Sequence, residues 1–168
     1  IAADSKYWLW INDQLVVFEG GLKRGPSPSG TYYDPVDIAP YLTKGSNTIA
    51  ILLWHFGKDG FSHINSGKAA LLFEAIAPGL EIVSDASWQC ALYEAYQNTE
   101  APFPNYRMPE SNIRFDARQV ITNWNRTSFE GSLPGAVCVG KAGKAPFGDL
   151  VERPIPQWKN SGLLSYVS

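Results

Sequence analysis

The clearest pattern in the chain is an alternation of side chains close to its start, in the segment YWLWIND. In a strand, successive side chains point to opposite faces of the sheet. One face of this segment therefore carries a tyrosine, a leucine and an isoleucine, and the other carries Trp8 and Trp10. Asn12 and Asp13 follow, and both residue types tolerate the positive φ that a two-residue turn requires. The pattern predicts a β-hairpin over residues 6–18.

The tryptophan face of this hairpin has two interpretations. Trp8 and Trp10 are either covered by a second protein layer or exposed as a platform on which a sugar ring stacks. We predict the first arrangement, in which neither indole has most of its area in solvent.

Two later segments also have the pattern of strands. Residues 48–56 (TIAILLWHF) are apolar on both faces, which is typical of a strand covered on both sides. Residues 69–77 (AALLFEAIA) form another apolar run and are predicted to be one strand. A single helical turn is predicted at 36–42, and the segment SDASW at 84–88 predicts a turn that docks a tryptophan.

Loops and turns make up much of the remaining chain. Residues 19–35 form a long loop rich in Gly, Pro and Ser, and residues 57–68 form a long polar loop. After residue 93 the pattern loosens into an extended arm that contains several prolines. Short strands are predicted beyond this arm, at 112–118 and at 132–143.

Many short strands separated by turn signals predict an all-β fold. We expect a jelly-roll β-sandwich of the galactose-binding-domain-like type, with an irregular and partly extended C-terminal region. Residues 1–80 are predicted to form the sandwich core, and residues 81–168 to add strands and an arm that complete the sandwich or lead to a next domain. The chain does not begin with Met and enters a strand almost at once. We therefore expect a piece of a longer protein, with its first strand lying upstream.

Composition and charge narrow the function classes. The net charge is -2 and no cluster of Lys and Arg is present, which argues against a surface that binds nucleic-acid phosphates. No apolar stretch has the length of a membrane span. Aromatic residues make up 13% of the chain and charged residues only 18%. This balance is common in secreted β proteins that act on carbohydrates.

The chain has two cysteines, Cys90 and Cys138, and no CxxC motif. They cannot form a zinc or redox motif of the usual spacing. We predict two free, partly buried thiols, and the alternative for an exported protein is a disulfide between them.

Candidates for catalysis or metal binding are sparse. Asp34 and Asp37 flank a turn and offer a general acid–base pair, but helix capping and turn hydrogen bonds explain the same residues. His55 and His63 have Asp59 between them, but a metal site needs three or four ligands at defined spacing. The sequence contains neither GxSxG nor GxxxxGK[ST]. We therefore predict no catalytic residue, no metal and no cofactor for this chain.

Saccharide binding is the remaining candidate chemistry. Tyr32, Tyr33 and Trp54 lie on or beside the two long loops, where exposed rings can stack on the apolar face of a sugar. Asp59 and His63 follow in the second loop and can bind hydroxyl groups. These five residues are the predicted carbohydrate-binding set. The alternative is that the rings fill the sandwich core or a contact with another domain.

Several motifs occur in an order that is informative beyond their individual patterns. They are ADSKYWLWINDQLVV, TYYDPVDIAPYLTKGSNTIAILLWHFGKDGFSH, SDASW, ESNIRFDAR and LVERPIPQW. Together they resemble the N-terminal β-sandwich domain of bacterial α-L-rhamnosidases, over most of the chain. The combination of FDAR with ERPIP is fairly specific. The asparagine turn and the KGxN element are also similar to the sugar-binding jelly roll of β-galactosidase-type enzymes.

The resemblance implies a function for the domain and its partners. In that family a separate (α/α) barrel hydrolyses the substrate with acidic residues, so the resemblance implies a non-catalytic accessory domain of an inverting α-L-rhamnosidase. The parent would be an exported bacterial enzyme, periplasmic or extracellular. The implied partners are the catalytic barrel of the same chain and, at loops 19–35 and 55–66, a rhamnose-containing oligosaccharide. The alternatives are an independent carbohydrate-binding module and an accessory domain of a β-galactosidase-type enzyme.

Overall fold

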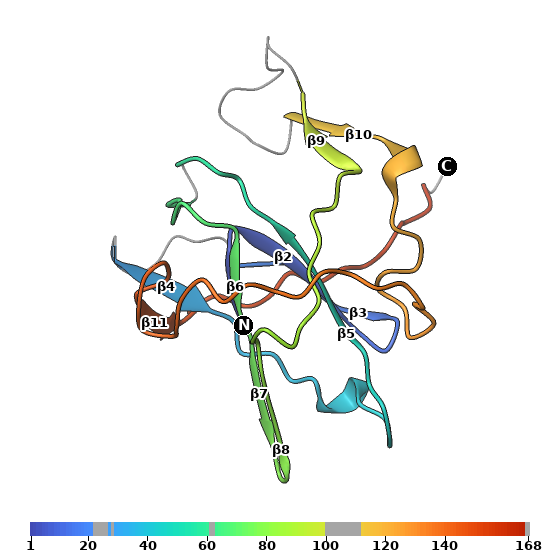
Figure 1. Ribbon diagram of the computed structural model, residues 1–168, viewed down its shortest axis with the longest axis horizontal. Coiled ribbons are helices and arrows are strands. Elements are labelled where there is room, and N and C mark those ends of the chain that lie inside the picture. The colour runs from blue at the N-terminus through green and yellow to red at the C-terminus, as the bar shows by residue number, and fades with distance from the viewer. Residues whose placement is uncertain (22–26, 28, 61–62, 100–111, 167–168) are drawn as a thin grey trace.

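The computed structural model describes residues 1–21, 27, 29–60, 63–99 and 112–166. In these residues strands predominate, and helical structure is limited to short 3₁₀ turns, among them η1 (Ala39–Tyr41) and η3 (Ala117–Gln119) (Figure 1). The strands are β1 (Ala2–Asp4), β2 (Lys6–Ile11), β3 (Gln14–Gly21), β4 (Gly30–Tyr33), β5 (Ile49–Trp54), β6 (Ala70–Leu72), β7 (Glu74–Ala77), β8 (Leu80–Val83), β9 (Tyr96–Asn98), β10 (Ile113–Phe115) and β11 (Asp149–Glu152). The predicted all-β fold class is confirmed.

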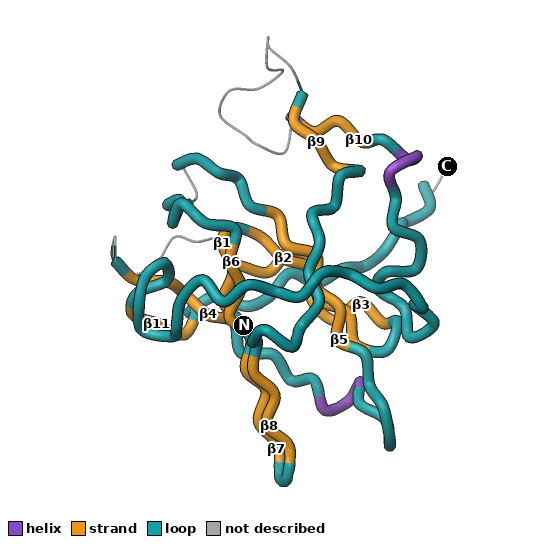
Figure 2. Tube along the Cα trace, in the orientation of Figure 1, coloured by secondary structure: helices purple, strands orange, loops and turns teal. Residues whose placement is uncertain are grey.

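The described strands are distributed over several small sheets. The central one has three antiparallel strands in the order β3-β2-β5. Two-stranded antiparallel sheets are formed by β1 with β6, β7 with β8, and β9 with β10. The strands β4 and β11 pair in parallel. Long loops connect these sheets, as the tube in Figure 2 shows.

The hairpin β2–β3 has the predicted two-residue turn. Asn12 and Asp13 adopt φ values of 47° and 72°, so both central positions are left-handed, as a type I′ turn requires. The side-chain Nδ2 of Asn12 donates to the Tyr41 carbonyl oxygen at 2.9 Å, and the Thr48 backbone N–H donates to Asn12 Oδ1 at 2.9 Å. A single turn side chain therefore joins the hairpin to η1 and to the segment that enters β5.

The core lies on one face of the central sheet. Tyr7, Leu9 and Ile11 are fully buried there and pack with Val17 and Phe73. Burial of side chains of this size contributes about 1.5–3 kcal/mol each to the free energy of unfolding.

The other face of β2 is also covered. Trp8 and Trp10 are half-buried, and the Trp10 ring packs edge-to-face against Trp124 with 5.2 Å between the ring centroids. A segment far along the chain thus supplies the second layer. The prediction that these indoles are covered rather than laid open is confirmed.

The apolar run 69–77 is not one strand, as the pattern predicted, but two. The strands β6 and β7 belong to different sheets, and Phe73 between them turns into the core. Ser84 fixes this bend, because its backbone N–H donates to the Phe73 carbonyl at 2.9 Å and its hydroxyl accepts from the Phe73 N–H at 3.0 Å. The β7–β8 hairpin consequently points away from the rest of the chain (Figure 1).

The segment SDASW docks its tryptophan as predicted. The Trp88 ring lies 5.3 Å from the Phe73 ring between centroids, and its indole N–H donates to the Val83 carbonyl at 3.0 Å. The tryptophan therefore closes the base of the β7–β8 hairpin.

The C-terminal part is irregular, as expected, and differs in detail from the prediction. Within the predicted strand 112–118, β10 occupies the first part and η3 the second. The predicted edge strand 132–143 is reduced to an isolated bridge between Gln89 and Gly135. The predicted extended arm falls partly on residues 100–111, which lie outside the described residues. The division of the chain at residue 80 stays a prediction.

Both cysteines are free and exposed, so the prediction of partly buried thiols was wrong. The Cys90 N–H donates to the Pro134 carbonyl at 2.8 Å, so Cys90 lies opposite Pro134. Cys138 follows Pro134 by four residues in the sequence. No helix in the described part of the chain is long and apolar enough to cross a membrane.

Candidate functional site

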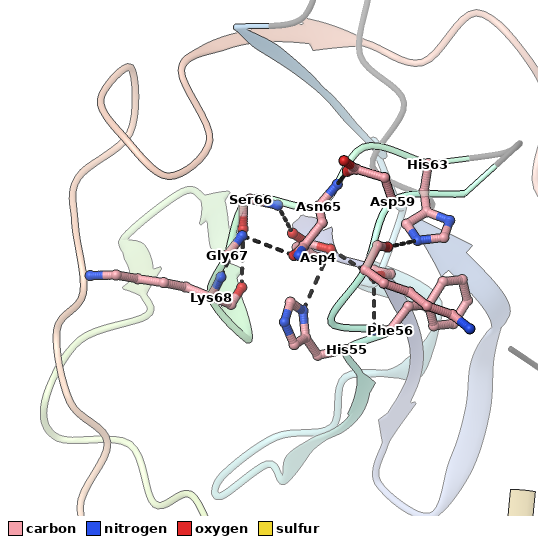
Figure 3. A network of polar contacts seen from close by, with 11 residues as sticks. Asp4, His55, Phe56, Asp59, His63, Asn65, Ser66, Gly67 and Lys68 are labelled. Atoms are coloured by element: carbon pink, nitrogen blue, oxygen red, sulfur yellow. Dashed lines mark hydrogen bonds and ion pairs between the residues drawn. The ribbon is translucent and has the colours of Figure 1, made fainter. Parts of the chain in front are cut away.

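The five predicted carbohydrate-binding residues fall on two parts of the fold. Trp54 ends β5, and Asp59 and His63 follow in the loop over residues 55–68, which Figure 3 shows from close by. Tyr32 and Tyr33 lie on β4. We call the first region, residues 55–68, the histidine loop.

Three rings at the end of β5 and in the histidine loop contact one another in sequence, each edge to face. Trp54 meets Phe56 edge-on at a centroid distance of 4.8 Å, and Phe56 meets His63 in the same way at 4.6 Å. His63 is only 2% exposed, and its Nε2 lies 2.5 Å from the Lys58 carbonyl oxygen. The imidazole of His63 therefore packs inside the loop and presents no ring face to solvent.

Asp59 is exposed, but its carboxylate also holds the loop together. Its Oδ1 accepts a hydrogen bond from the Asn65 N–H at 2.7 Å. The Asn65 side chain in turn accepts from the Gly67 N–H at 2.9 Å. This is the local side chain to backbone bonding that Asp and Asn provide in turns.

A buried carboxylate that the sequence analysis did not single out anchors the histidine loop. Asp4 in β1 is fully buried and accepts from the Ser5 hydroxyl at 2.6 Å and from the Ser66 N–H at 2.7 Å. His55 Nδ1 lies 3.7 Å from Asp4 Oδ1, and the Phe56 N–H donates to Ser5 Oγ at 3.2 Å (Figure 3). Both ends of the loop are therefore tied to Asp4 and its neighbour. The available sequence signal was an aspartate in an otherwise apolar segment, between Ala3 and the strand that begins at Lys6.

The tyrosines on β4 have a different environment. Tyr32 and Tyr33 are half-buried and stand opposite Val151 and Glu152 of β11. In the part of the chain that the structure describes, no hydrogen bond or ring contact joins them to the histidine loop. The structure thus places Asp59 and His63 in the histidine loop, with Trp54 at the end of the strand that enters it, and places the two tyrosines on a separate sheet.

A second buried carboxylate organises the end of β4. Asp34 is 2% exposed; its Oδ2 accepts from the Tyr7 hydroxyl at 2.7 Å and from the Gly21 N–H at 2.9 Å. Its Oδ1 lies 2.5 Å from Nε of Arg153, whose Nη1 donates to the Gly21 carbonyl at 2.6 Å. The arginine of the ERPIP motif thus pairs with the aspartate of the YYDP motif. We call Tyr7, Gly21, Asp34 and Arg153 the Asp34 node.

The bonding of Asp34 argues against an acid–base role with Asp37. Both Asp34 oxygens already have partners, and Asp37 is exposed and accepts from the Ala39 N–H at 3.0 Å. Asp37 therefore has the turn hydrogen bond that was predicted, whereas Asp34 is held by residues far from it in the sequence and not by turn or capping bonds. No group of three or more potential metal ligands occurs among the described residues.

Because the Tyr7 hydroxyl is buried in the Asp34 node, we expect the free energy of unfolding to fall at alkaline pH. Burial, and then the charge and hydrogen bond of Asp34, raise the pKa of Tyr7 far above its ordinary value near 10. Above pH ~10 the unfolded chain releases the Tyr7 proton and the folded chain keeps it, so the free energy of unfolding falls, by up to ~1.4 kcal/mol per pH unit. Tyr7→Phe should remove this component in urea unfolding measured between pH 8 and 11.

The control for this experiment is Tyr166→Phe, which changes a fully exposed tyrosine. It should keep the alkaline slope of the unchanged chain. Equal slopes for the unchanged chain and Tyr7→Phe would contradict the assignment.

Comparisons with known proteins identify one structural relative. The fold is similar to part of the crystal structure, at 1.9 Å, of a GH78 family rhamnosidase of Bacillus sp. GL1, with a TM-score of 0.75 and 30% sequence identity. The match covers 92% of this chain and 16% of that chain, so this chain spans about one sixth of the length of that enzyme. No family model and no curated protein matches the sequence. The predicted resemblance to a rhamnosidase domain is confirmed.

Proposed function

We propose that this chain is a non-catalytic accessory domain of an α-L-rhamnosidase and packs on the (α/α) barrel that carries out hydrolysis. The observation that carries the proposal is the structural match, which covers nearly all of this chain and a small part of a GH78 rhamnosidase. A match of this kind is expected for one module of a large enzyme. The composition supports an exported parent, periplasmic or extracellular.

The carboxylates support the non-catalytic role. An inverting glycosidase needs an acid and a base, with carboxyl groups about 6.5–9.5 Å apart and room for a water molecule between them and the substrate. Among the residues that the structure describes, the buried carboxylates are Asp4 and Asp34, and both are bound by protein donors. Their oxygens therefore have structural partners within the fold.

The burial and hydrogen bonds of the histidine loop favour packing on the catalytic barrel, rather than saccharide recognition, as the main role of this domain. His63 is buried and Asp59 holds the loop, so these two residues have structural uses. Several large apolar residues are exposed to solvent; the exposed fraction is 75% for Ile76, 84% for Leu92 and 81% for Val137. We expect these side chains to be covered by the barrel in the full-length enzyme.

Hydrolysis of an aryl α-L-rhamnoside tests the proposal. The full-length enzyme that carries this domain should hydrolyse the substrate, and the 168-residue chain alone should give no turnover above the uncatalysed rate. A full-length enzyme without activity on any rhamnoside would overturn the assignment to a rhamnosidase. Turnover by the isolated chain, abolished by Asp34→Asn, would overturn the non-catalytic role.

A further inference from the structure

A cleft lies beside the Asp34 node, between the end of β4 and the segment that follows β11. Its volume is about 270 Å³, and Pro35, Pro154, Ile155 and Pro156 form its apolar lining. This volume is near the lower end for small-molecule sites, which suits a ligand with a single ring. The cleft is separate from the histidine loop.

Three buried polar atoms of the residues that line this cleft have no hydrogen-bond partner: Nε and Nη2 of Arg153, and Oε1 of Gln157. Of these, Nε has an ionic partner, because it lies against Asp34 Oδ1. The Arg153 side chain is only 9% exposed; two of its nitrogens contact Asp34 and Gly21, but Nη2 is unpaired. Oε1 of Gln157 is also buried and unpaired. An unpaired buried donor or acceptor is costly and uncommon in folded proteins, so we expect these atoms to bind hydroxyl groups from outside the chain, those of water or of a ligand that replaces it. Gln157 is half-buried, and both Gln157 and Arg153 line the cleft.

The charges around the cleft indicate a neutral ligand. The positive charge of Arg153 is balanced by Asp34 in direct contact, and Glu152 adds a carboxylate to the lining. An anion would therefore meet no net positive charge. A neutral ligand must offer an acceptor to Arg153 Nη2 and a donor to Gln157 Oε1, and hydroxyl groups offer both.

The geometry points to a binding site for a small neutral polyhydroxyl ligand, one sugar ring, in the cleft between Pro35 and residues 152–157. Neighbouring hydroxyls pair with the Arg153 guanidinium and the Gln157 amide, and the apolar side of the ring lies on the prolines and Ile155. The site goes beyond the proposed accessory role, which does not require it.

An NMR titration of the 168-residue chain tests the site, with L-rhamnose and D-galactose as neutral probes and D-galacturonate as an anionic one. A neutral sugar should shift the Gln157 side-chain amide signals and the backbone signals of 152–157 with millimolar affinity. Gln157→Ala should weaken binding at least about fivefold. Arg153→Lys should do the same, because lysine keeps the charge beside Asp34 but lacks the second guanidinium nitrogen.

Gln119→Ala is the matched control, because Gln119 is exposed in η3, outside the cleft lining. It should leave the affinity unchanged, and the NMR spectrum of each variant shows whether it is folded. The site would be overturned by no shift at 152–157 with either neutral sugar, by equal affinity for Gln157→Ala and the unchanged chain, or by tighter binding of D-galacturonate. N-acetylglycinamide serves as a further probe, in place of a peptide segment. Shifts with N-acetylglycinamide alone would assign the cleft to a peptide segment and also overturn it. The rhamnoside assay on the full-length enzyme is independent of all these outcomes.

Discussion

Replacing Asp34 with alanine should lower the free energy of unfolding by about 3–5 kcal/mol, the range found when one partner of a buried ion pair is removed. The variant leaves the Arg153 guanidinium buried without its counter-charge and removes the acceptor of the Tyr7 hydroxyl and of the Gly21 N–H. Urea unfolding at pH 7, followed by tryptophan fluorescence, measures the loss.

The neighbouring variant Asp37→Ala is the control. Asp37 is an exposed carboxylate with one hydrogen bond, to the Ala39 N–H, so its loss should cost about 1 kcal/mol at most. The double variant Asp34→Asn, Arg153→Met removes both charges and should be less destabilised than the sum of its single variants. A loss of less than 1 kcal/mol for Asp34→Ala would show that the ion pair is not formed in solution.

Replacing Gly148 with alanine should cost about 3 kcal/mol or more. Gly148 has φ of +66°, and a Cβ there would lie 1.6 Å from the Ser29 carbonyl oxygen, a backbone atom that cannot move aside alone. The cost of the left-handed conformation, about 1–2 kcal/mol, is thus added to that of forcing the chain at Ser29 away. Because Ser29 directly precedes β4 and Gly148 directly precedes β11, the variant should loosen the pairing of these strands.

Gly143→Ala separates the two contributions. Gly143 has a similar φ of +72°, but a Cβ there would meet nothing within 4 Å. It should therefore show only the conformational cost, about 1–2 kcal/mol in the same unfolding measurement. Equal losses for the two variants would show that the contact with Ser29 does not restrict the strand pair.

The local elements of this fold could be predicted from the sequence because their determinants are close together along the chain. Asn12 and Asp13 specify the turn of the β2–β3 hairpin through their own backbone preferences. The apolar residues of β5 and the docking of Trp88 likewise follow from short segments. The rhamnosidase resemblance came from the order of such segments.

The long-range contacts could not be predicted, because no local pattern specifies them. Nothing near Arg153 indicates that its partner is Asp34, and the parallel pairing of β11 with β4 brings together segments that no sequence periodicity relates. The same holds for the candidate site. His63 looked like an exposed loop residue, but its ring packs against Phe56 within the histidine loop. Residues 69–77 form two strands because the Phe73 side chain between them packs in the core, and this contact is not specified by the local sequence.

The pairing of β4 with β11 has a consequence for synthesis of the protein. The ribosome produces β4 early and β11 only after more than a hundred further residues, which at 5–20 residues per second is a delay on the order of ten seconds. Throughout that interval the nascent chain carries an unpaired strand edge next to a carboxylate that still lacks its arginine. Closure of the domain is thus a late event in translation, and a ribosome that stalls before residue 149 holds a chain open to aggregation and to chaperones.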